Sequence, residues 1–139
     1  MTPQEIADKS AQAMWESDEA SKWFGMAIEK VAPGYALMSL TVEAHHCNGH
    51  GDCHGGVSFS LADSAFAFAC NSYNELCVGQ HTMMSYLRRV SKGDILSAEA
   101  QETNRGRKSG IYDVTVKNQD GKICAEMRGF SHRVDGTLY

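Results

Sequence analysis

One carboxylate, Asp63, lies in a segment, residues 57–70, that otherwise contains no charged residue. Wound as a helix, this segment is apolar nearly all round, which is typical of a buried helix. An unpaired buried carboxylate is costly, so it usually has a partner or a function. His54, Gly55 and Gly56 come just before the helix, and glycines let a helix start approach a ligand closely. An acid near an anion-binding helix start indicates acyl-transfer chemistry.

Each of these groups has a possible role in that chemistry. Burial should raise the pKa of Asp63, unless a donor or a cation offsets it. The carboxylate can act as a general base on water or as a nucleophile toward an activated carbonyl. A backbone N–H of Gly55 or Gly56 can stabilise the developing oxyanion. The alternative is that Asp63 is bonded to a neighbouring hydroxyl or backbone group and only specifies the fold.

The spacing of Gly55 and Asp63 has a geometric consequence. They are eight positions apart (63 − 55), which is about 12 Å along a helix. One carbonyl carbon cannot lie about 3 Å from both groups if they belong to the same helix. Either the loop folds back, or the two groups come from two chains. We favour a dimer in which antiparallel helices are related by C2 symmetry.

The loop before the helix contains further polar residues. We expect His54 to orient the loop and not to act as a base. Asn48 is either a turn residue in the left-handed region or an amide that holds water or a substrate carbonyl. The histidines and cysteines of residues 45–54 match no common zinc spacing, so we expect no metal site. Nucleophilic catalysis by Cys47 or Cys53 is a weaker alternative, because neither thiol begins a helix.

Two groups of basic residues follow later in the chain. They would suit a phosphorylated ligand at the mouth of a groove, or they are solvated turn charges. The same groove could also bind an acyl ligand without converting it. The residues are Arg88, Arg89, Lys92, Arg105, Arg107 and Lys108.

The sequence pattern of the first half of the chain predicts the elements that position the apolar helix at residues 57–70. Residues 3–24 read as one or two amphipathic helices, with Ser17 as a possible N-cap ahead of two acids. A strand then ends at the turn of Pro33 and Gly34. Residues 35–44 form a second strand with four alternating residues on one face, namely Ala36, Met38, Leu40 and Val42.

The second half predicts mostly sheet. After the helix, which ends near residue 71, Tyr112, Val114 and Val116 show a clear two-residue period. A single apolar helix between antiparallel strands is best buried by wrapping the sheet around it. The predicted fold class is therefore α+β. The strand candidates are residues 83–87, 95–102, 111–118 and 122–132.

Composition sets the broad class. A chain of 139 residues fits one domain, here 1–139 with a helical segment at 1–24. The net charge of −4 does not indicate a basic surface that binds nucleic acid. No apolar run approaches the roughly 20 residues that span a bilayer. The N-terminus does not read as a secretory signal. Five cysteines without regular spacing indicate free thiols in a reducing cytoplasm, with Cys70 and Cys124 in the core.

These residues carry a family resemblance. The run from Asn48 to Gly56, followed by Leu61, Ala62 and Asp63, resembles the hotdog-fold acyl-CoA thioesterases, and more narrowly the PaaI type of phenylacetate degradation. The likeness covers most of the chain from about residue 35. It extends through Tyr86-Leu87-Arg88, residues 110–114 and residues 128–133.

The resemblance implies a long helix wrapped by a curved antiparallel sheet, in homodimers that pair into homotetramers. The active site would use both chains of a dimer. Asp63 would be the catalytic carboxylate, and the Gly55 N–H would polarise the thioester carbonyl. Asn48 would position the carbonyl or the attacking water, and His54 would support the loop. Substrate-binding residues would be Gly56, Arg88, Arg89 and Lys108.

Two features depart from the family pattern. Arg89 stands where relatives often have proline, and this residue is part of the expected phosphate-binding surface. Residues 80–84 are unlike the usual small polar run, and we expect them to line the acyl pocket.

The predicted function is hydrolysis of phenylacetyl-CoA, hydroxylated phenylacetyl-CoA or related acyl-CoA thioesters by a cytoplasmic enzyme without a cofactor. One alternative is a hydratase or dehydratase on the same scaffold, for which His54 and Asp63 are the only acid–base pair. The other is an acyl-CoA binding protein without catalytic activity.

Overall fold

The computed structural model describes residues 1–139, and its elements follow the predicted order of helices, two strands, one long helix and four strands. The helices are α1 (Pro3–Ser17), α2 (Glu19–Phe24) and α3 (Gly55–Cys70), with a 3₁₀-helix η1 at Ala44–His46. The strands are β1 (Ala27–Ala32), β2 (Tyr35–Thr41), β3 (Cys77–Tyr86), β4 (Ile95–Arg105), β5 (Ser109–Lys117) and β6 (Ile123–Arg133).

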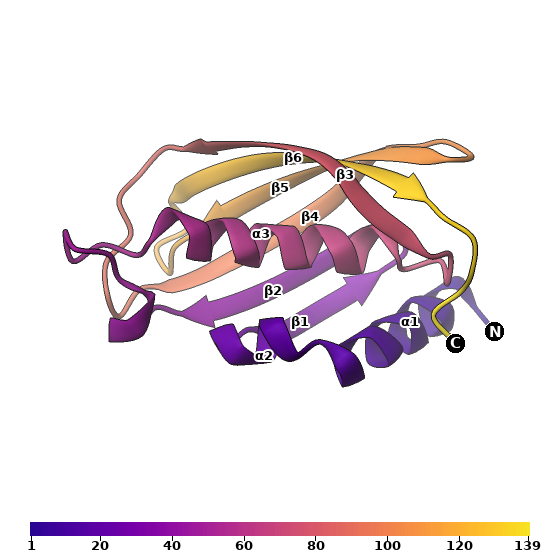
Figure 1. The fold of residues 1–139 in the computed structure, drawn as a ribbon, viewed down its shortest axis with the longest axis horizontal. Coiled ribbons are helices and arrows are strands. Elements are labelled where there is room, and N and C mark those ends of the chain that lie inside the picture. Colours follow the sequence, from indigo (N-terminus) through magenta and orange to yellow (C-terminus); the bar gives the residue numbers. More distant parts are fainter.

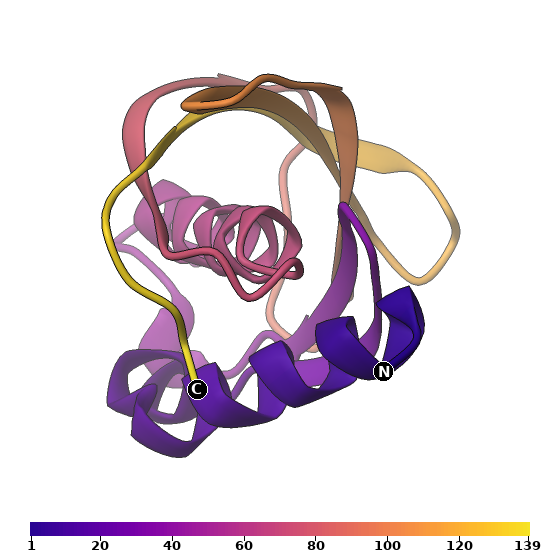
Figure 2. The same cartoon turned by 90° about the vertical axis from the view of Figure 1, so that its right-hand side faces the viewer.

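The six strands form one antiparallel sheet in the order β1-β2-β4-β5-β6-β3. The sheet curls around α3, which runs along its concave side (Figure 1). Seen along the helix, the strands surround α3 over most of its circumference, while α1 and α2 lie at the opening beside β1 (Figure 2). The predicted α+β architecture, with the helix as its filling, is confirmed.

Alternating burial connects β2 to this core. Ala36, Met38, Leu40 and Val42 are all at most 2% exposed, as the two-residue period predicts. Tyr112, Val114 and Val116 of β5 are buried in the same way. Both strands therefore present one apolar face to α3, and burial of that face stabilises the fold by the hydrophobic effect.

Phe66 fixes how closely α3 packs against the sheet. Its ring is 1% exposed and lies over the backbone of Gly79 and Gly129. A Cβ atom at Gly129 would lie 2.9 Å from three ring carbons, and one at Gly79 would lie 3.0 Å from the ring. These two strands therefore need glycine where the helix side chain enters the sheet.

Several boundaries differ from the sequence prediction. Asp18 and not Ser17 caps α2, because its side chain accepts the N–H of Ser21 at 2.9 Å. The second strand ends at Thr41, where the chain turns toward η1. The strand expected at residues 83–87 begins at Cys77. Its early part lies at the sheet edge, where exposure on both sides removes the alternation that the prediction used.

The expectation that α3 is buried all round is wrong for one stripe. Gly56 and Asp63 are exposed, and Ser60 and Ala67 are half-buried, at the spacing of one helix face. The sheet and α2 cover the rest of the helix. A mostly apolar helix thus keeps one uncovered face in the single chain, and Asp63 lies on it.

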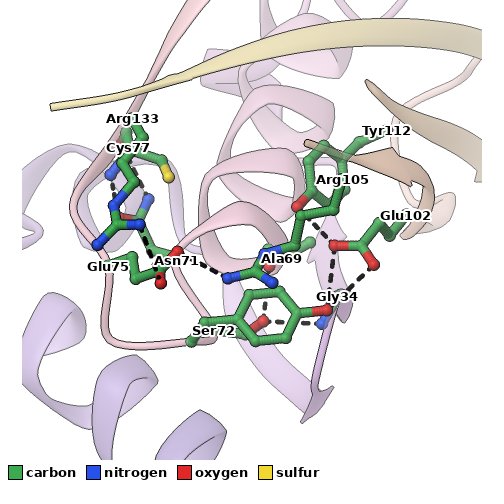
Figure 3. A network of polar contacts seen from close by, with 11 residues as sticks. Gly34, Ala69, Asn71, Ser72, Glu75, Cys77, Glu102, Arg105, Tyr112 and Arg133 are labelled. Carbon is green, nitrogen blue, oxygen red and sulfur yellow. Dashed lines mark hydrogen bonds and ion pairs between the residues drawn. The ribbon is translucent and has the colours of Figure 1, made fainter. Parts of the chain in front are cut away.

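A polar network holds the segment between α3 and β3 (Figure 3). Ser72 accepts the N–H of Gly34 at 2.8 Å and donates to the Ala69 carbonyl at 2.7 Å. Glu102 accepts hydroxyl bonds from Tyr112 at 2.8 Å and from Tyr73 at 3.0 Å. Because these bonds join α3 to the β1–β2 turn and to β4 and β5, they fix the C-terminal end of α3.

Two smaller features complete the fold. None of the helices combines the length and the apolar character that crossing a bilayer requires. All five cysteines are free thiols, and Cys70 and Cys124 are buried as predicted.

Candidate active site

The start of α3 presents one free backbone donor. His54 is the N-cap residue, and its Nδ1 accepts the N–H of Gly56 at 2.9 Å. Because Gly55 is the first helical residue, the helix supplies no acceptor for its N–H, and no loop acceptor bonds to it. Of the two N–H groups that the sequence offered, Gly56 is therefore engaged and Gly55 is free to bind an oxyanion.

His54 acts on the loop as predicted. Its Nδ1 is an acceptor, so a neutral ring carries its proton on Nε2. Its backbone N–H donates to the His46 carbonyl at 2.8 Å, which joins the cap to η1. Within one chain, His54 caps the start of α3, and Asp63 lies nine positions further on, in the middle of the helix. They form no acid–base pair there.

Asn48 is a turn residue, as one of its two predictions has it, and part of its amide remains free for the other predicted role of holding a ligand. Its Oδ1 accepts the N–H groups of His50 at 2.9 Å and Asp52 at 3.2 Å, which makes it a turn residue. Its backbone is not in the left-handed region. With Oδ1 engaged, only the amide NH₂ remains to bind a ligand, and it can donate but not accept.

A pocket of about 370 Å³ lies at this end of α3. It brings together Asn48, Gly55, Arg88 and Arg89, four of the residues that the sequence predicted for the site. Arg89 donates from Nε to Asp52 at 2.9 Å, whereas Arg88 forms no ion pair. The pocket thus combines a helix N-terminus with two guanidinium groups, a combination suited to an anionic ligand.

The sequence prediction gave no role to Tyr86. Its hydroxyl donates to the Gly55 carbonyl at 3.0 Å, and its ring would lie 3.3 Å from a Cβ at Gly55. Tyr86 is 31 residues from Gly55, at the end of β3. No local pattern signals this contact, because it arises from the way β3 returns along α3.

Asp63 lies in a different pocket, about 390 Å³ in volume and mostly apolar. Its side chain reaches solvent, but the surrounding protein removes part of its hydration, and this desolvation raises its pKa. No hydrogen bond or cation offsets the rise. The expected full burial of Asp63 is therefore wrong for the single chain, while the expected direction of the pKa shift is confirmed. Within the single chain, Asp63 accepts no bond from a hydroxyl or backbone group, so the alternative of a fold-specifying carboxylate finds no support there.

Gly55 and Asp63 both belong to α3, so the loop does not fold back. Within one chain, the free donor and the desolvated carboxylate line separate pockets. Lys108 also lies apart from Arg88 and Arg89, in a crevice with Arg107 and Arg133 at the β4–β5 turn. One chain alone therefore assembles only part of the predicted site.

Two members of the histidine and cysteine cluster, His46 and Cys53, are poorly placed for metal binding or nucleophilic catalysis. Both ring nitrogens of the buried His46 are engaged, Nδ1 with the Glu43 N–H at 2.9 Å and Nε2 with the Phe24 carbonyl at 2.8 Å. A metal ion bound by Glu43, His45 and His46 would have to break one of these bonds. Burial raises the pKa of the Cys53 thiol, which makes it a poor nucleophile.

Residues 80–84 do not line the pocket that contains Asp63. From β3, that pocket is lined by Cys77, Val78 and Gly79. Met83 faces the outer side of the sheet, beside Phe130. The pocket's walls also include Met14 and Leu138, which the sequence did not indicate.

Comparisons with known proteins place the chain in a family. Residues 50–125 match the thioesterase superfamily. The chain belongs to this superfamily. Among curated relatives, the acyl-coenzyme A thioesterase PaaI of Escherichia coli (strain K12) is 43% identical over 130 residues, which are 94% of this chain and 93% of that protein.

Solved structures of this superfamily show the same fold. The E. coli PaaI protein from the phenylacetic acid degradation operon superposes with a TM-score of 0.96 at 42% identity, covering 98% of this chain and 99% of that one. A mutant of the phenylacetic acid degradation protein PaaI from Thermus thermophilus gives a TM-score of 0.79 at 35% identity, covering 82% and 97%. The hotdog fold that the resemblance implied is thereby confirmed.

Proposed function

We propose that this thioesterase hydrolyses acyl-CoA thioesters of the phenylacetyl or hydroxyphenylacetyl type to the free acid and CoA. The likeness to the E. coli acyl-coenzyme A thioesterase PaaI supports the reaction class. The observation that carries the proposal is chemical. The helix offers a free N–H at Gly55 for an oxyanion and a desolvated, unpartnered carboxylate at Asp63 for a base.

In the proposed mechanism the carbonyl oxygen of the thioester accepts the Gly55 N–H. Asp63 takes a proton from water as the water oxygen attacks the carbonyl carbon. Negative charge develops on the carbonyl oxygen, where the helix start stabilises it. The tetrahedral intermediate then expels the CoA thiolate, which takes up the proton. Direct attack by Asp63, giving an anhydride that water opens, is the rival route.

The two groups meet if two copies of the chain pair through the uncovered face of α3. In an antiparallel pair, Gly55 lies opposite Asp63 when the two-fold axis passes at their midpoint, residue 59. Phe59 would then lie at the axis. Gly56, Ser60 and Ala67 on this face are small, so a second helix can approach closely.

The edge of the sheet beside this helix supports the same pairing. β3 is a ten-residue edge strand that leaves one row of backbone groups unpaired. It carries large exposed apolar side chains, with Val78 47%, Met83 60% and Tyr86 57% exposed. Burying them in a dimer would remove this apolar surface from water. Following the resemblance, we propose that such dimers pair into homotetramers in the cytoplasm.

Basic residues would hold the CoA phosphates at the pocket by Gly55. Arg88 and Arg89 line it, and the amide NH₂ of Asn48 can donate to the substrate carbonyl or phosphate. Lys108 lies near the C-terminal end of α3, in a crevice that also includes Cys70. An antiparallel pair brings that end of the second copy toward Gly55 of the first. Lys108 would then act from the second copy.

Thiol release from phenylacetyl-CoA tests the function. Free CoA is followed with a thiol reagent for the wild type, Asp63→Asn and the control Asp120→Asn, which changes an exposed turn carboxylate in the same way. We expect release by the wild type and the control, and a loss of about 10² or more in kcat for Asp63→Asn. No release from phenylacetyl-CoA or a panel of other acyl-CoA thioesters would contradict the proposal and favour a binding protein or a hydratase.

A further inference from the structure

The pocket that contains Asp63 runs along α3 toward the C-terminal end of the helix. Its helix wall is formed by Asp63, Phe66, Ala67, Cys70 and Asn71, which follow one another at one-turn intervals. From Asp63 to Asn71 is eight positions, about 12 Å. An acyl group whose carbonyl lies at Asp63 therefore has a channel of limited length ahead of it.

The two ends of the chain close the far part of this channel. Met14 of α1 and Leu138 of the C-terminal segment both line the pocket. The C-terminal segment descends from the sheet past the end of α3 and lies against α1 (Figure 2). Leu138 is half-buried. The wall therefore depends on a segment that follows β6 and belongs to no helix or strand.

Hydrogen bonds to Asn74 and Leu76, which we call the Asn74 clamp, hold this segment in place. Asn74 is the one residue other than glycine with a positive φ, 56°, and its Oδ1 accepts the N–H groups of Leu138 at 2.8 Å and Tyr139 at 3.3 Å. Leu76 adds two backbone bonds, donating to Gly136 at 3.2 Å and accepting from Val134 at 2.9 Å. The left-handed turn at Asn74 is a conformation that costs free energy unless its surroundings enforce it.

The channel contains no charge apart from Asp63. Both ends of the Asn71 amide are engaged, with Oδ1 accepting the Cys77 N–H at 2.9 Å and Nδ2 donating to the Ala67 carbonyl at 2.9 Å. The far wall is thus apolar, formed by Leu76, Leu138 and Met14. Such a wall accepts an uncharged acyl group and limits how far it extends.

We infer that Leu138, held by the Asn74 clamp, and Met14 set the maximum length of the acyl group that this thioesterase accepts. The inference rests on the proposed function and assigns a specificity role to the two chain ends. An arylacetyl or medium-length acyl group fits between Asp63 and the wall, and a long-chain acyl group meets Leu138.

The test is the acyl-length profile of kcat/KM with phenylacetyl-CoA, octanoyl-CoA and dodecanoyl-CoA. Leu138→Ala opens the wall, so the ratio of dodecanoyl-CoA to phenylacetyl-CoA should rise about tenfold or more. Asn74→Gly keeps the left-handed turn but removes the amide, so it should shift the ratio in the same direction with Leu138 intact. Ile123→Ala, a truncation of an exposed residue outside the pocket, should leave the ratio unchanged.

The outcomes separate the inference from the function it depends on. If the wild type releases CoA but Leu138→Ala and Asn74→Gly keep the wild-type ratio, the inference is wrong and the proposed function stands. An equal loss for all three substrates in both variants also overturns it, because a length limit acts only on the longest acyl group. If the wild type hydrolyses none of the substrates, it is the proposed function that fails.

Discussion

Gly55 and Asp63 lie on one uninterrupted helix, eight residues apart, and they line two different pockets. The free N–H of Gly55 and the desolvated carboxylate of Asp63 therefore cannot serve the same carbonyl from a single chain. This relationship links the chemistry of the site to its assembly. We therefore propose that two copies of the chain together form the hydrolytic site.

Proline at residue 55 tests the backbone donor. Gly55→Pro deletes the N–H, while the first helical position tolerates proline and His54, at ψ 134°, already has the conformation that precedes proline. We expect a loss of about 10²–10³ in kcat with a similar thermal stability. Gly55→Ala is the matched control, since it meets the same Tyr86 ring and keeps the N–H. Equal losses in both variants would mean that contact with Tyr86, and not the donor, matters.

The desolvation of Asp63 predicts a pH dependence of activity. Because its pKa is raised, the acid limb of kcat/KM should have its midpoint above the ordinary range of aspartate, about 3.9. Activity falls as pH drops through this midpoint, since the carboxylate must be ionised to act as a base. A pH–rate profile measures it. A midpoint at or below the ordinary value would show that Asp63 is fully hydrated in the active enzyme.

The same shift predicts a change in stability. The folded state holds the Asp63 proton more tightly than the unfolded state, so ionisation lowers stability as pH rises from the unfolded pKa through the raised folded pKa. Asp63→Asn removes this loss. Its Tm should therefore exceed that of the wild type at pH 7 and the difference should vanish near pH 3, with Asp120→Asn as control. A lower Tm for Asp63→Asn at pH 7 would contradict the assignment.

Packing between Phe66 and Gly129 predicts a coupled pair of substitutions. Gly129→Ala places a methyl group 2.9 Å from three ring carbons, which overpacks the core and should cost about 1–3 kcal/mol. Phe66→Leu makes room, so the double variant should lose less than the sum of the two single losses. Urea unfolding measures all three. Additive losses would show that the sheet relaxes away from the ring.

The thiol pair at the channel predicts unequal reactivity. The neighbouring Cys70 thiol lowers the pKa of the Cys77 thiol, whereas the Cys77 thiol and burial raise the pKa of Cys70. Because the thiolate is the nucleophile, limited alkylation at pH 7–8 should label Cys77 well before Cys70, as peptide mass spectrometry can follow. Cys70→Ala should slow the labelling of Cys77. Faster labelling in that variant would mean that access and not the pKa controls the reaction.

Periodic residues made most of the fold predictable. The alternation in β2 and β5 and the long apolar run of α3 each appear in the sequence, and each has the predicted type and burial. The start of β3 was not predicted, because residues 77–82 lie at a sheet edge where neither face is fully buried. The open face of α3 was also missed. A helix that is apolar all round predicts cover on every side, whereas the folded single chain leaves the stripe that contains Asp63 open.

The local structure of the candidate site was predictable where its residues are close in sequence. Asn48 and His54 lie in the loop before α3, and local hydrogen bonds make Asn48 a turn residue and His54 the helix cap. The contact of Tyr86 and the walls at Met14 and Leu138 come from distant segments that only the folded chain brings together. Nothing in the local pattern of those residues distinguishes them from ordinary apolar positions.

Mixing two inactive variants tests the shared site most directly. Asp63→Asn keeps the Gly55 donor and Gly55→Pro keeps the Asp63 carboxylate, so a mixed dimer has one site with both groups intact. Random pairing after co-expression should restore about a quarter of the wild-type thiol release from phenylacetyl-CoA, since half of the dimers are mixed and each has one working site of two. If the mixture stays as inactive as the separate variants, the site does not combine Gly55 of one chain with Asp63 of another.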